Sequence, residues 1–264
     1  SRFSMDKSKI EHYGDELYNA LITRTAVAPL TDREADITIE DAYQIQQRMI
    51  QRRLDAGETI IGKKIGVTSK VVMDMLKVNQ PDFGMMTSGM VFNEGESIDT
   101  STMIAPRAEA EVAFVLKSDL MGPGVTAADV LRATDFVVPC FEIVDSRIQD
   151  WKIKIQDTVA DNASCGVLVL GGRRKSPADI DLALAGMVLE KNGEIISTST
   201  GAAVQGSPVN AVAWLANTLG KLGIGLKAGE VILSGSQSPL VPVKAGDSLV
   251  CTVGGLGGTS VRFI

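Results

Sequence analysis

The chain has 264 residues, of which 45% are hydrophobic, and it carries a formal net charge of −6 with a pI of about 5.0. This length allows one large core, or a main domain with a small accessory one. An acidic chain without a cluster of Lys and Arg is a poor nucleic-acid binder, because neutralised phosphates supply most of that affinity. No apolar run approaches the roughly 20 residues of a membrane helix, so no membrane partner is expected.

Cysteine and histidine are both scarce, and each scarcity is informative. Cys140, Cys165 and Cys251 are widely spaced and form no CxxC pair, which favours buried thiols in a reducing cytoplasm. His12 is the single histidine and lies near the N-terminus. Histidine is the commonest general base, so proton transfers here would fall to carboxylates, lysine, water or a metal. Ser-His-Asp and Cys-His sites are nearly excluded, unless the N-terminal segment folds back into the site.

Residues 1–60 are predicted to form a helical N-terminal region. The first four residues read as a tag remnant, and no apolar signal core follows them. Apolar residues recur at helical spacing over 8–23 and again in the segment that Thr38 opens. Thr38 can cap this second helix, and Asp41 stands three residues on, as in a capping box.

Residues 61–264 are predicted to form a sheet-rich catalytic domain, because short β-like runs with glycine punctuation replace the helical pattern. Asn192-Gly193 predicts a hairpin with a type I′ turn. Helices interrupt the strands at about 125–134 and 207–222, and the second begins with Ser-Pro and ends at a glycine. The order of elements predicts an α+β fold with a helical N-terminal portion.

The run "AEAEVAFVL" at 108–116 raises the first functional question. In a strand of period two, Glu109 and Glu111 share one face with Ala113, while Val112 and Phe114 point to the core. Two like charges on neighbouring same-face positions repel each other, and a cation would relieve them. Taken alone, the run is also compatible with two solvated acids on a sheet surface.

A third acid favours the cation. Glu142 lies between Phe141 and Ile143 in a strongly apolar strand, and a lone buried glutamate needs a partner. Three carboxylates without a histidine or a cysteine motif are typical of a hard-cation site, Mg²⁺ or Mn²⁺ ahead of Ca²⁺. Such a site leaves about half of an octahedral shell open, as a catalytic metal requires.

Two further segments carry candidate polar residues. "IIGKKIGVTS" contains Lys63 and Lys64, and strand alternation sends one inward and one outward. Lys64 is the favoured inward residue, although either could be a solvated edge lysine. "QPDFGMM" reads as a proline-led turn that presents Asp82, which could also be ordinary turn chemistry.

Two hydroxyl-rich segments complete the candidate set. "DTVADNAS" places Asn162 and Ser164 ahead of a strand, where a helix cap is the simpler explanation. "LSGSQSPLVPV" presents Ser236 between two other serines in a glycine-containing loop, which could cradle a carboxylate or be an ordinary loop. "GGLGG" at 254–258 lacks the strand-glycine-helix context of a nucleotide loop and reads as a tight strand connection.

Several long motifs in the same order resemble the fumarylacetoacetate hydrolase superfamily. The sequence is similar to its bacterial branch of 2-hydroxypenta-2,4-dienoate (2-keto-4-pentenoate) hydratases and 4-oxalocrotonate decarboxylases. These motifs run over most of the chain and include "GKKIGVTS", "QPDFG", "PRAEAEVAFVL", "EIVDSRIQDW", "DTVADNASCG" and "GSPVNAVAWLAN". The resemblance implies an α+β fold with a mixed sheet rolled into a barrel-like core.

The resemblance also implies roles for single residues. Glu109, Glu111 and Glu142 would hold Mg²⁺ or Mn²⁺, and Lys64 would offset negative charge that develops on the substrate. Asp82 would be the first candidate for the base that activates water, with a metal-bound water as the second. Asn162, Ser164 and Ser236 would contact the substrate.

The implied activity is metal-dependent hydration of 2-hydroxypenta-2,4-dienoate to 4-hydroxy-2-oxopentanoate in aromatic meta-cleavage catabolism. The alternatives are 4-oxalocrotonate decarboxylase, a hydratase of longer 2-oxo-enedioates, a C–C hydrolase and a non-catalytic subunit. The hydrolase is disfavoured because such enzymes generally use a histidine-containing dyad, and only His12 is present. The resemblance further implies a cytoplasmic homo-oligomer, found with the pathway decarboxylase as a partner.

Overall fold

The N-terminal part of the chain is helical, as its apolar spacing predicts. In this computed structural model, which describes residues 5–264, Asp6 and Thr38 each cap the start of a long helix. Thr38 and Asp41 form the predicted capping box, with hydrogen bonds of 2.9 and 3.1 Å. The expected tag remnant lies outside the described residues. The helices are α1 (Lys7–Thr23), α2 (Leu30–Arg33) and α3 (Ile39–Asp55).

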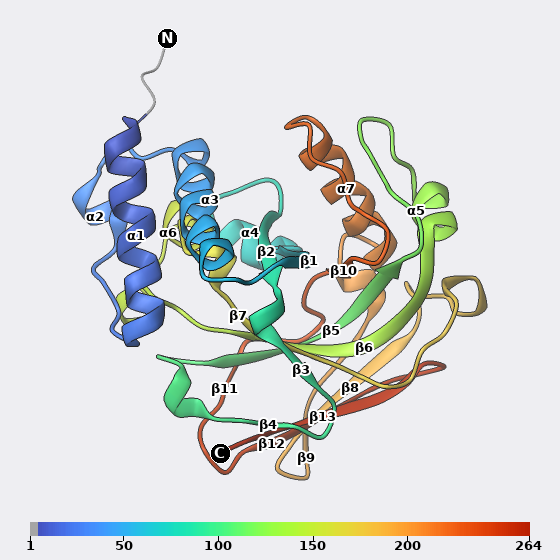
Figure 1. Ribbon diagram of the computed structural model, residues 1–264. Helices are drawn as coiled ribbons and strands as arrows, with labels where there is room; N and C mark the ends of the chain where they lie inside the picture. The colour runs from blue at the N-terminus through green and yellow to red at the C-terminus, as the bar shows by residue number, and fades with distance from the viewer. Residues whose placement is uncertain (1–4) are drawn as a thin grey trace.

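These helices form a small core of their own. α3 packs on α1 and on α6 (Ile155–Ala160), which comes from much later in the chain. Leu17, Ile45 and Val159 are fully buried where these helices meet. Figure 1 shows the helical group at one side of the molecule, beside the sheets.

Eight strands form the main sheet: β1 (Ile60–Gly66), β2 (Asp82–Thr87), β3 (Val91–Asn93), β5 (Arg107–Leu116), β6 (Thr134–Val144), β7 (Cys165–Leu170), β10 (Val231–Leu233) and β11 (Val241–Pro242). Their order is β2-β1-β10-β5-β6-β7-β3, with β11 added to β5. The sheet is mixed, because β1 with β10 and β3 with β7 are parallel while the other pairs are antiparallel. Figure 1 shows β5 and β6 curving strongly at its centre.

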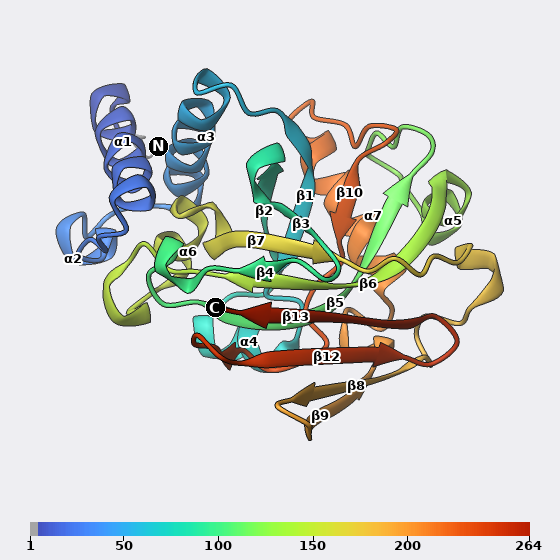
Figure 2. The same ribbon diagram turned by 60° about the horizontal axis from the view of Figure 1, so that its bottom comes forward.

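Five strands form a second sheet: β4 (Ser97–Ile98), β8 (Gly186–Lys191), β9 (Glu194–Thr200), β12 (Ser248–Val253) and β13 (Gly257–Phe263). Their order is β4-β13-β12-β8-β9, and β12 and β13 pack against β6 of the main sheet (Figure 2). Asn192 and Gly193 have φ of 52° and 85°, as the predicted β8–β9 hairpin turn requires. The "GGLGG" segment makes the turn between β12 and β13, as predicted.

Three more helices are α4 (Lys70–Leu76), α5 (Ala127–Ala133) and α7 (Pro208–Gly220). The latter two were predicted from the sequence, and Thr126 and Ser207 cap them. α5 and α7 pack on each other beside the main sheet (Figure 1). α4 was not predicted, and it buries none of its residues.

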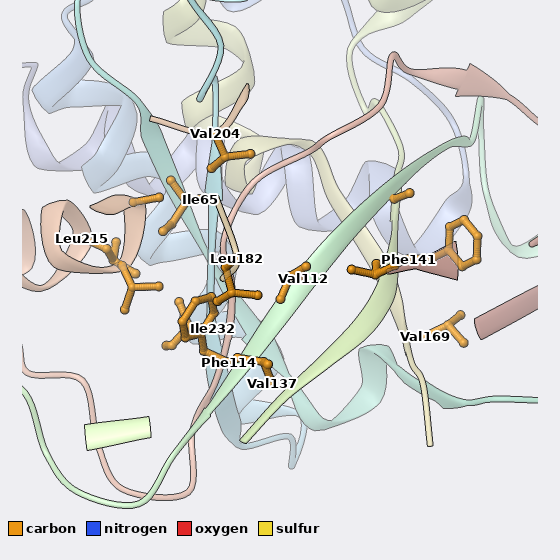
Figure 3. Packing of buried hydrophobic residues seen from close by; sticks show 14 of the residues in the cluster. Ile65, Val112, Phe114, Val137, Phe141, Val169, Leu182, Val204, Leu215 and Ile232 are labelled. Atoms are coloured by element: carbon orange, nitrogen blue, oxygen red, sulfur yellow. The ribbon is translucent and has the colours of Figure 1, made fainter. Parts of the chain in front are cut away.

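The main core lies on one face of the curled sheet. Figure 3 shows Phe114 of β5 next to Ile232 of β10, Val112 further along β5, and Phe141 of β6 on the side of Val169, all in one buried cluster. All five side chains are at most 1% exposed. Because side chains alternate along β5, the opposite face is left for Glu109 and Glu111.

The predicted α+β fold with a curled mixed sheet is confirmed. β1 begins at Ile60, beside the predicted boundary between 1–60 and 61–264. Treating these parts as separate domains stays a prediction, since α6 of the second part packs on α3 of the first. Within residues 5–264, no helix has the length and apolar character needed to cross a membrane.

Candidate active site

Pairing of β5 with β6 brings the three candidate glutamates together. Glu109 lies directly opposite Glu142, and Glu111 lies two residues further along the same face of β5. One carboxylate oxygen from each residue lies within 4.8 Å of the others. We call this group, Glu109, Glu111 and Glu142, the acidic cup. The face continues through Ala113 and Cys140 into an apolar cluster, so the cup has a dry side.

The acidic cup brings together more carboxyl groups than its surroundings can stabilise in the ionised form. Glu111 and Glu142 are fully buried, and the Gly235 N–H donates to Glu111 Oε1 at 2.8 Å. Glu111 Oε2 and both oxygens of Glu142 accept no hydrogen bond from residues 5–264. Burial, together with the Glu142 charge, raises the pKa of Glu109 to about 8 and that of Glu111 well above its ordinary value. A hard divalent cation requires oxygen ligands, and buried carboxylate oxygens without hydrogen-bond partners can supply them, so the residues fit such an ion.

Lys64 of β1 supplies the positive charge at the cup. Its Nζ lies 3.0 Å from Glu142 Oε2, as an ion pair without hydrogen-bond alignment, and donates to the Ala163 carbonyl at 2.7 Å. Burial lowers the pKa of Lys64, but the charges of Glu142 and Asp82, with smaller contributions from other groups, together outweigh this, and the net pKa is raised. Lys63 points to the other face, as alternation predicts, yet it is also buried. Glu230 compensates its charge there and accepts from it at 2.7 and 2.8 Å.

Asp82 begins β2, and the turn expected there ends just before it. The residue pairs with Gly66 of β1 and is only 3% exposed. A Cβ on Gly66 would lie 2.4 Å from Asp82 Oδ1 and 3.4 Å from Lys64 Nζ, so this glycine leaves room for both side chains. Asp82 Oδ1 accepts no hydrogen bond from the described part of the chain. Burial raises the pKa of Asp82, which the Lys64 charge opposes and the Glu142 charge supports.

The "DNAS" segment is a tight turn rather than a simple cap. Residues 162–164 all have positive φ, between 52° and 57°. Asn162 accepts from the Met85 N–H at 2.9 Å and donates to the Met85 carbonyl at 2.8 Å, so its amide extends the edge of β2. Asn162 therefore does not line the cavity that borders the acidic cup, whereas Ser164 lines it. The Oγ of Ser164 is 2.8 Å from Thr158 Oγ1.

A buried ion pair that sequence reasoning missed holds this turn in place. Arg147 Nε donates to Asp161 Oδ1 at 2.6 Å, and Nη2 donates to the Asp161 carbonyl at 2.9 Å. Both side chains are at most 1% exposed. The motif "SRIQDW" and the acid before "NAS" are visible in the sequence, but only the fold shows that they meet.

The serine-rich loop after β10 closes another side of the site. Ser236 lies beside the Glu109 carboxylate, and its Oγ donates to the Ser238 carbonyl at 2.7 Å. Gln237, which sequence reasoning did not single out, is 6% exposed, and its Oε1 has no partner among residues 5–264. Its backbone N–H donates to the Ala110 carbonyl, which fixes the loop on β5.

A cavity of about 620 Å³ borders the acidic cup, and we call it the main cavity. Lys64, Asp82 and Glu109 form its polar wall, with Ser164, Ser236 and Gln237. Apolar side chains line much of the remainder: Val71, Val72, Met75, Leu76, Trp151, Ile153 and Leu240. His12 is not among the lining residues, and on α1 its side chain is 67% exposed beside Glu16.

Comparisons with known proteins agree with this geometry. Residues 63–263 match the family model described as fumarylacetoacetate (FAA) hydrolase C-terminal. The chain is 58% identical to a 2-hydroxyhexa-2,4-dienoate hydratase of Comamonas testosteroni, over 98% of both chains. It is 65% identical to a 2-hydroxypent-2,4-dienoate hydratase of Pseudomonas putida, over 83% of this chain and all of that one. It is also similar to a structure of 4-oxalocrotonate decarboxylase from Pseudomonas putida G7 in complex with magnesium and adipate, at a TM-score of 0.97, 35% identity and full coverage of both chains.

Proposed function

The chain belongs to the fumarylacetoacetate hydrolase family, in its 2-keto-4-pentenoate hydratase branch, and we infer that it is a hydro-lyase that hydrates 2-hydroxypenta-2,4-dienoate. The resemblance stated from the sequence motifs is thereby confirmed. The observation that carries the inference is a buried three-carboxylate cup beside a mostly apolar cavity, in a chain so similar to dienoate hydratases. The branch places the reaction in meta-cleavage catabolism of aromatic compounds.

We propose that Glu109, Glu111 and Glu142 hold one Mg²⁺ or Mn²⁺ ion. Support comes from the unpartnered oxygens of Glu111 and Glu142, from the hard oxygen ligands, and from magnesium in the structure of the similar decarboxylase. When bound, the ion would act as a Lewis acid toward the 2-oxygen of the substrate.

The proposed reaction has two halves, and Lys64 lies where it can stabilise the charge that develops in the second. Loss of the 2-hydroxyl proton and protonation at C5 convert the dienol to 2-oxopent-3-enoate. Water then adds at C4 and a proton at C3, which gives 4-hydroxy-2-oxopentanoate. Negative charge develops on the 2-oxygen during this addition, and the buried ammonium of Lys64 would stabilise it in a largely desolvated site.

Asp82 is the proposed base for the water that adds at C4. It lines the main cavity, and the free Oδ1 can accept a water proton. Ser164 and Ser236 are proposed to contact the substrate, because both line the same cavity. For Asn162 we propose a positioning role, since its amide is already bound at both ends to Met85.

The charge of the cavity wall favours a monocarboxylate substrate. Lys64 is the single Lys or Arg among the described residues that line the main cavity, and Glu142 and Ala163 already engage it. A second carboxylate, as in 4-oxalocrotonate or a longer enedioate, would enter an apolar region without a cationic partner. Burying an unpaired charge is costly, so such substrates should bind poorly.

The 35% identity to the decarboxylase keeps 4-oxalocrotonate decarboxylation as the second candidate. The test is to incubate the Mg²⁺-loaded protein separately with 2-hydroxypenta-2,4-dienoate and with 4-oxalocrotonate, and to identify products by NMR. We expect 4-hydroxy-2-oxopentanoate from the first and no CO₂ from the second. CO₂ release without hydration would make the protein the decarboxylase, and no turnover of any dienoate would make it a non-catalytic subunit.

We also propose a homo-oligomer in the reducing cytoplasm, able to bind the pathway decarboxylase. Exposed apolar residues support the self-association, since Ile195 and Ile196 lie on edge strand β9 and are 64% and 41% exposed. All three cysteines are free and buried, which agrees with a reducing compartment. Sedimentation analysis of the protein, alone and with the decarboxylase, tests both associations.

A further inference from the structure

A second cavity reaches Asp82 from another part of the molecule. It has a volume of about 460 Å³ and lies among α3, the segment before β2, and α6. Ile39 and Tyr43 of α3, Val78 and Gln80 of the segment, and Val159 of α6 are among its lining residues. Within residues 5–264, Asp82 is the one residue that lines both this cavity and the main cavity.

The inner end of the second cavity presents polar atoms beside Asp82. Tyr43 Oη accepts from the Phe83 N–H at 3.3 Å, and the Tyr43 ring stacks on Phe83 with centroids 4.3 Å apart. The hydroxyl proton of Tyr43 has no acceptor among residues 5–264 and can be donated to water. Asp82 Oδ1 is buried and unpartnered, so it is an acceptor for a water that reaches it from Tyr43.

The outer end is open to solvent. Lys77, Asn79 and Gln80 line the second cavity and are exposed, so bulk water can enter between polar side chains. At roughly 30 Å³ for each water molecule of the liquid, the volume has room for several. The second cavity is therefore open to solvent and has Asp82, the proposed base, among its lining residues.

The proposed reaction consumes one water in each turnover. A dienoate bound at the acidic cup would occupy the part of the main cavity beside Lys64 and Glu109, with its apolar tail toward the α4 side chains. A second path would let water reach Asp82 from the side that the substrate leaves free. Addition forms the water O–C4 bond, moves one water proton to Asp82, and returns a proton from Asp82 to C3, so water is the only co-reactant.

We propose that the second cavity delivers the substrate water to Asp82, while the dienoate enters through the main cavity. This rests on the proposed hydratase function and deepens it, because it separates the entry path of each reactant. Tyr43 is a positioning residue in this scheme, since it would orient water toward Asp82 without touching the dienoate.

The test uses the fact that the two halves of the reaction differ in their need for water. Conversion of the dienol to 2-oxopent-3-enoate consumes none, whereas hydration consumes one. Val78→Trp and Ile39→Trp place bulk in the second cavity from two different elements. With the Mg²⁺-loaded variants, both products are followed by NMR, and deuterium incorporation at C5 in D₂O reports the first half separately.

We expect both filled variants to keep C5 deuteration and to accumulate 2-oxopent-3-enoate. Hydration relative to deuteration should fall about tenfold or more, because misplacing a reactant is that costly. Val71→Trp on α4 is the matched control, since Val71 lines the main cavity and does not line the second cavity. It should raise KM for the dienoate and leave the product ratio as in the wild type.

Three other results have distinct meanings. Filled variants that melt like the wild type and keep its product ratio would overturn the water path. A product ratio shifted equally by Val71→Trp would also overturn it, because the two cavities would then not differ. A wild-type protein that deuterates or hydrates no dienoate would instead contradict the proposed function.

Discussion

Glu142 is the residue on which the electrostatics of the site depend most. It faces Glu109 across the β5–β6 pair and lies 3.0 Å from Lys64. Glu142→Gln keeps the shape of the side chain but removes its charge. Mg²⁺ affinity, measured by calorimetric titration, should fall, and kcat should fall with it. Loss of a residue that only supports a metal ligand costs about 10- to 100-fold in affinity, and loss of a ligand should cost more. The exposed Glu194→Gln serves as control, and unchanged metal affinity in Glu142→Gln would remove this residue from the metal site.

Glu58, which lies outside the active site, also shows how burial and hydrogen-bond donors compete to set the pKa of a carboxyl group. Its carboxylate accepts from Arg53 at 2.9 and 3.1 Å, from Thr87 Oγ1 at 2.7 Å and from the Gly89 N–H at 2.9 Å. Burial raises the pKa of Glu58, but these donors outweigh it and lower the pKa below 4.5. A lowered folded-state pKa stabilises the fold above pH 4.5, and this contribution is lost as the pH falls through the folded-state value.

Glu58→Gln should therefore lower the free energy of unfolding by about 1–2 kcal/mol at pH 7, because charge-assisted hydrogen bonds to Arg53 are lost. The difference from wild type should shrink as the pH falls below 4.5. Urea unfolding at several pH values measures it, with Glu194→Gln expected within about 0.5 kcal/mol of wild type throughout. A difference that does not depend on pH would mean that the charge of Glu58 contributes nothing.

At this scale, what the sequence predicts depends on the range of the interaction. Glu109 and Glu111 could be placed on one face because alternation within a strand is local. Glu142 could be singled out because a glutamate in an apolar strand needs a partner. Gln237 and the Asn162–Met85 pairing could not be predicted, because both depend on chain segments that meet only in the fold.

At the scale of elements, the close approach of β1 and β2 sets the geometry around Asp82. Gly66→Ala would put a Cβ 2.4 Å from Asp82 Oδ1, and the flexible carboxylate would move away. We expect kcat to fall about 100-fold, the cost of a small misplacement of a catalytic group. Mg²⁺ affinity should persist, because the acidic cup is untouched. Gly186→Ala on β8 is the control, since its Cβ would meet open space; wild-type kcat in Gly66→Ala would argue against Asp82 as the base.

The elements that sequence analysis missed share a physical reason. β2 is buried on both faces, so it shows no alternation of polar and apolar residues. α4 has only seven residues and buries none, so it has no apolar stripe that faces a core. α6 is shorter still and depends on packing against α3. The long helices and β5, β6 and β8–β9 were predictable, because caps, turns and periodicity agree locally.

At the scale of the whole molecule, the arrangement of the two sheets could not be derived from local patterns. Adjacent strands such as β8 and β9 follow from their turn, but pairing of β1 with β10 joins residues about 170 positions apart. The barrel-like curl was expected through the family resemblance alone. That long-range pairing carries Lys64 to the cup and encloses the main cavity, so the active site is a property of the complete fold.

Metal dependence of turnover is the measurement that tests the account most directly. Protein stripped of metal by exhaustive chelation is assayed with 2-hydroxypenta-2,4-dienoate before and after addition of Mg²⁺ or Mn²⁺. The account predicts no 4-hydroxy-2-oxopentanoate from the stripped protein and recovery of its formation when either ion is added, because the three carboxylates then regain the cation they fit. Full turnover by the stripped protein would contradict it.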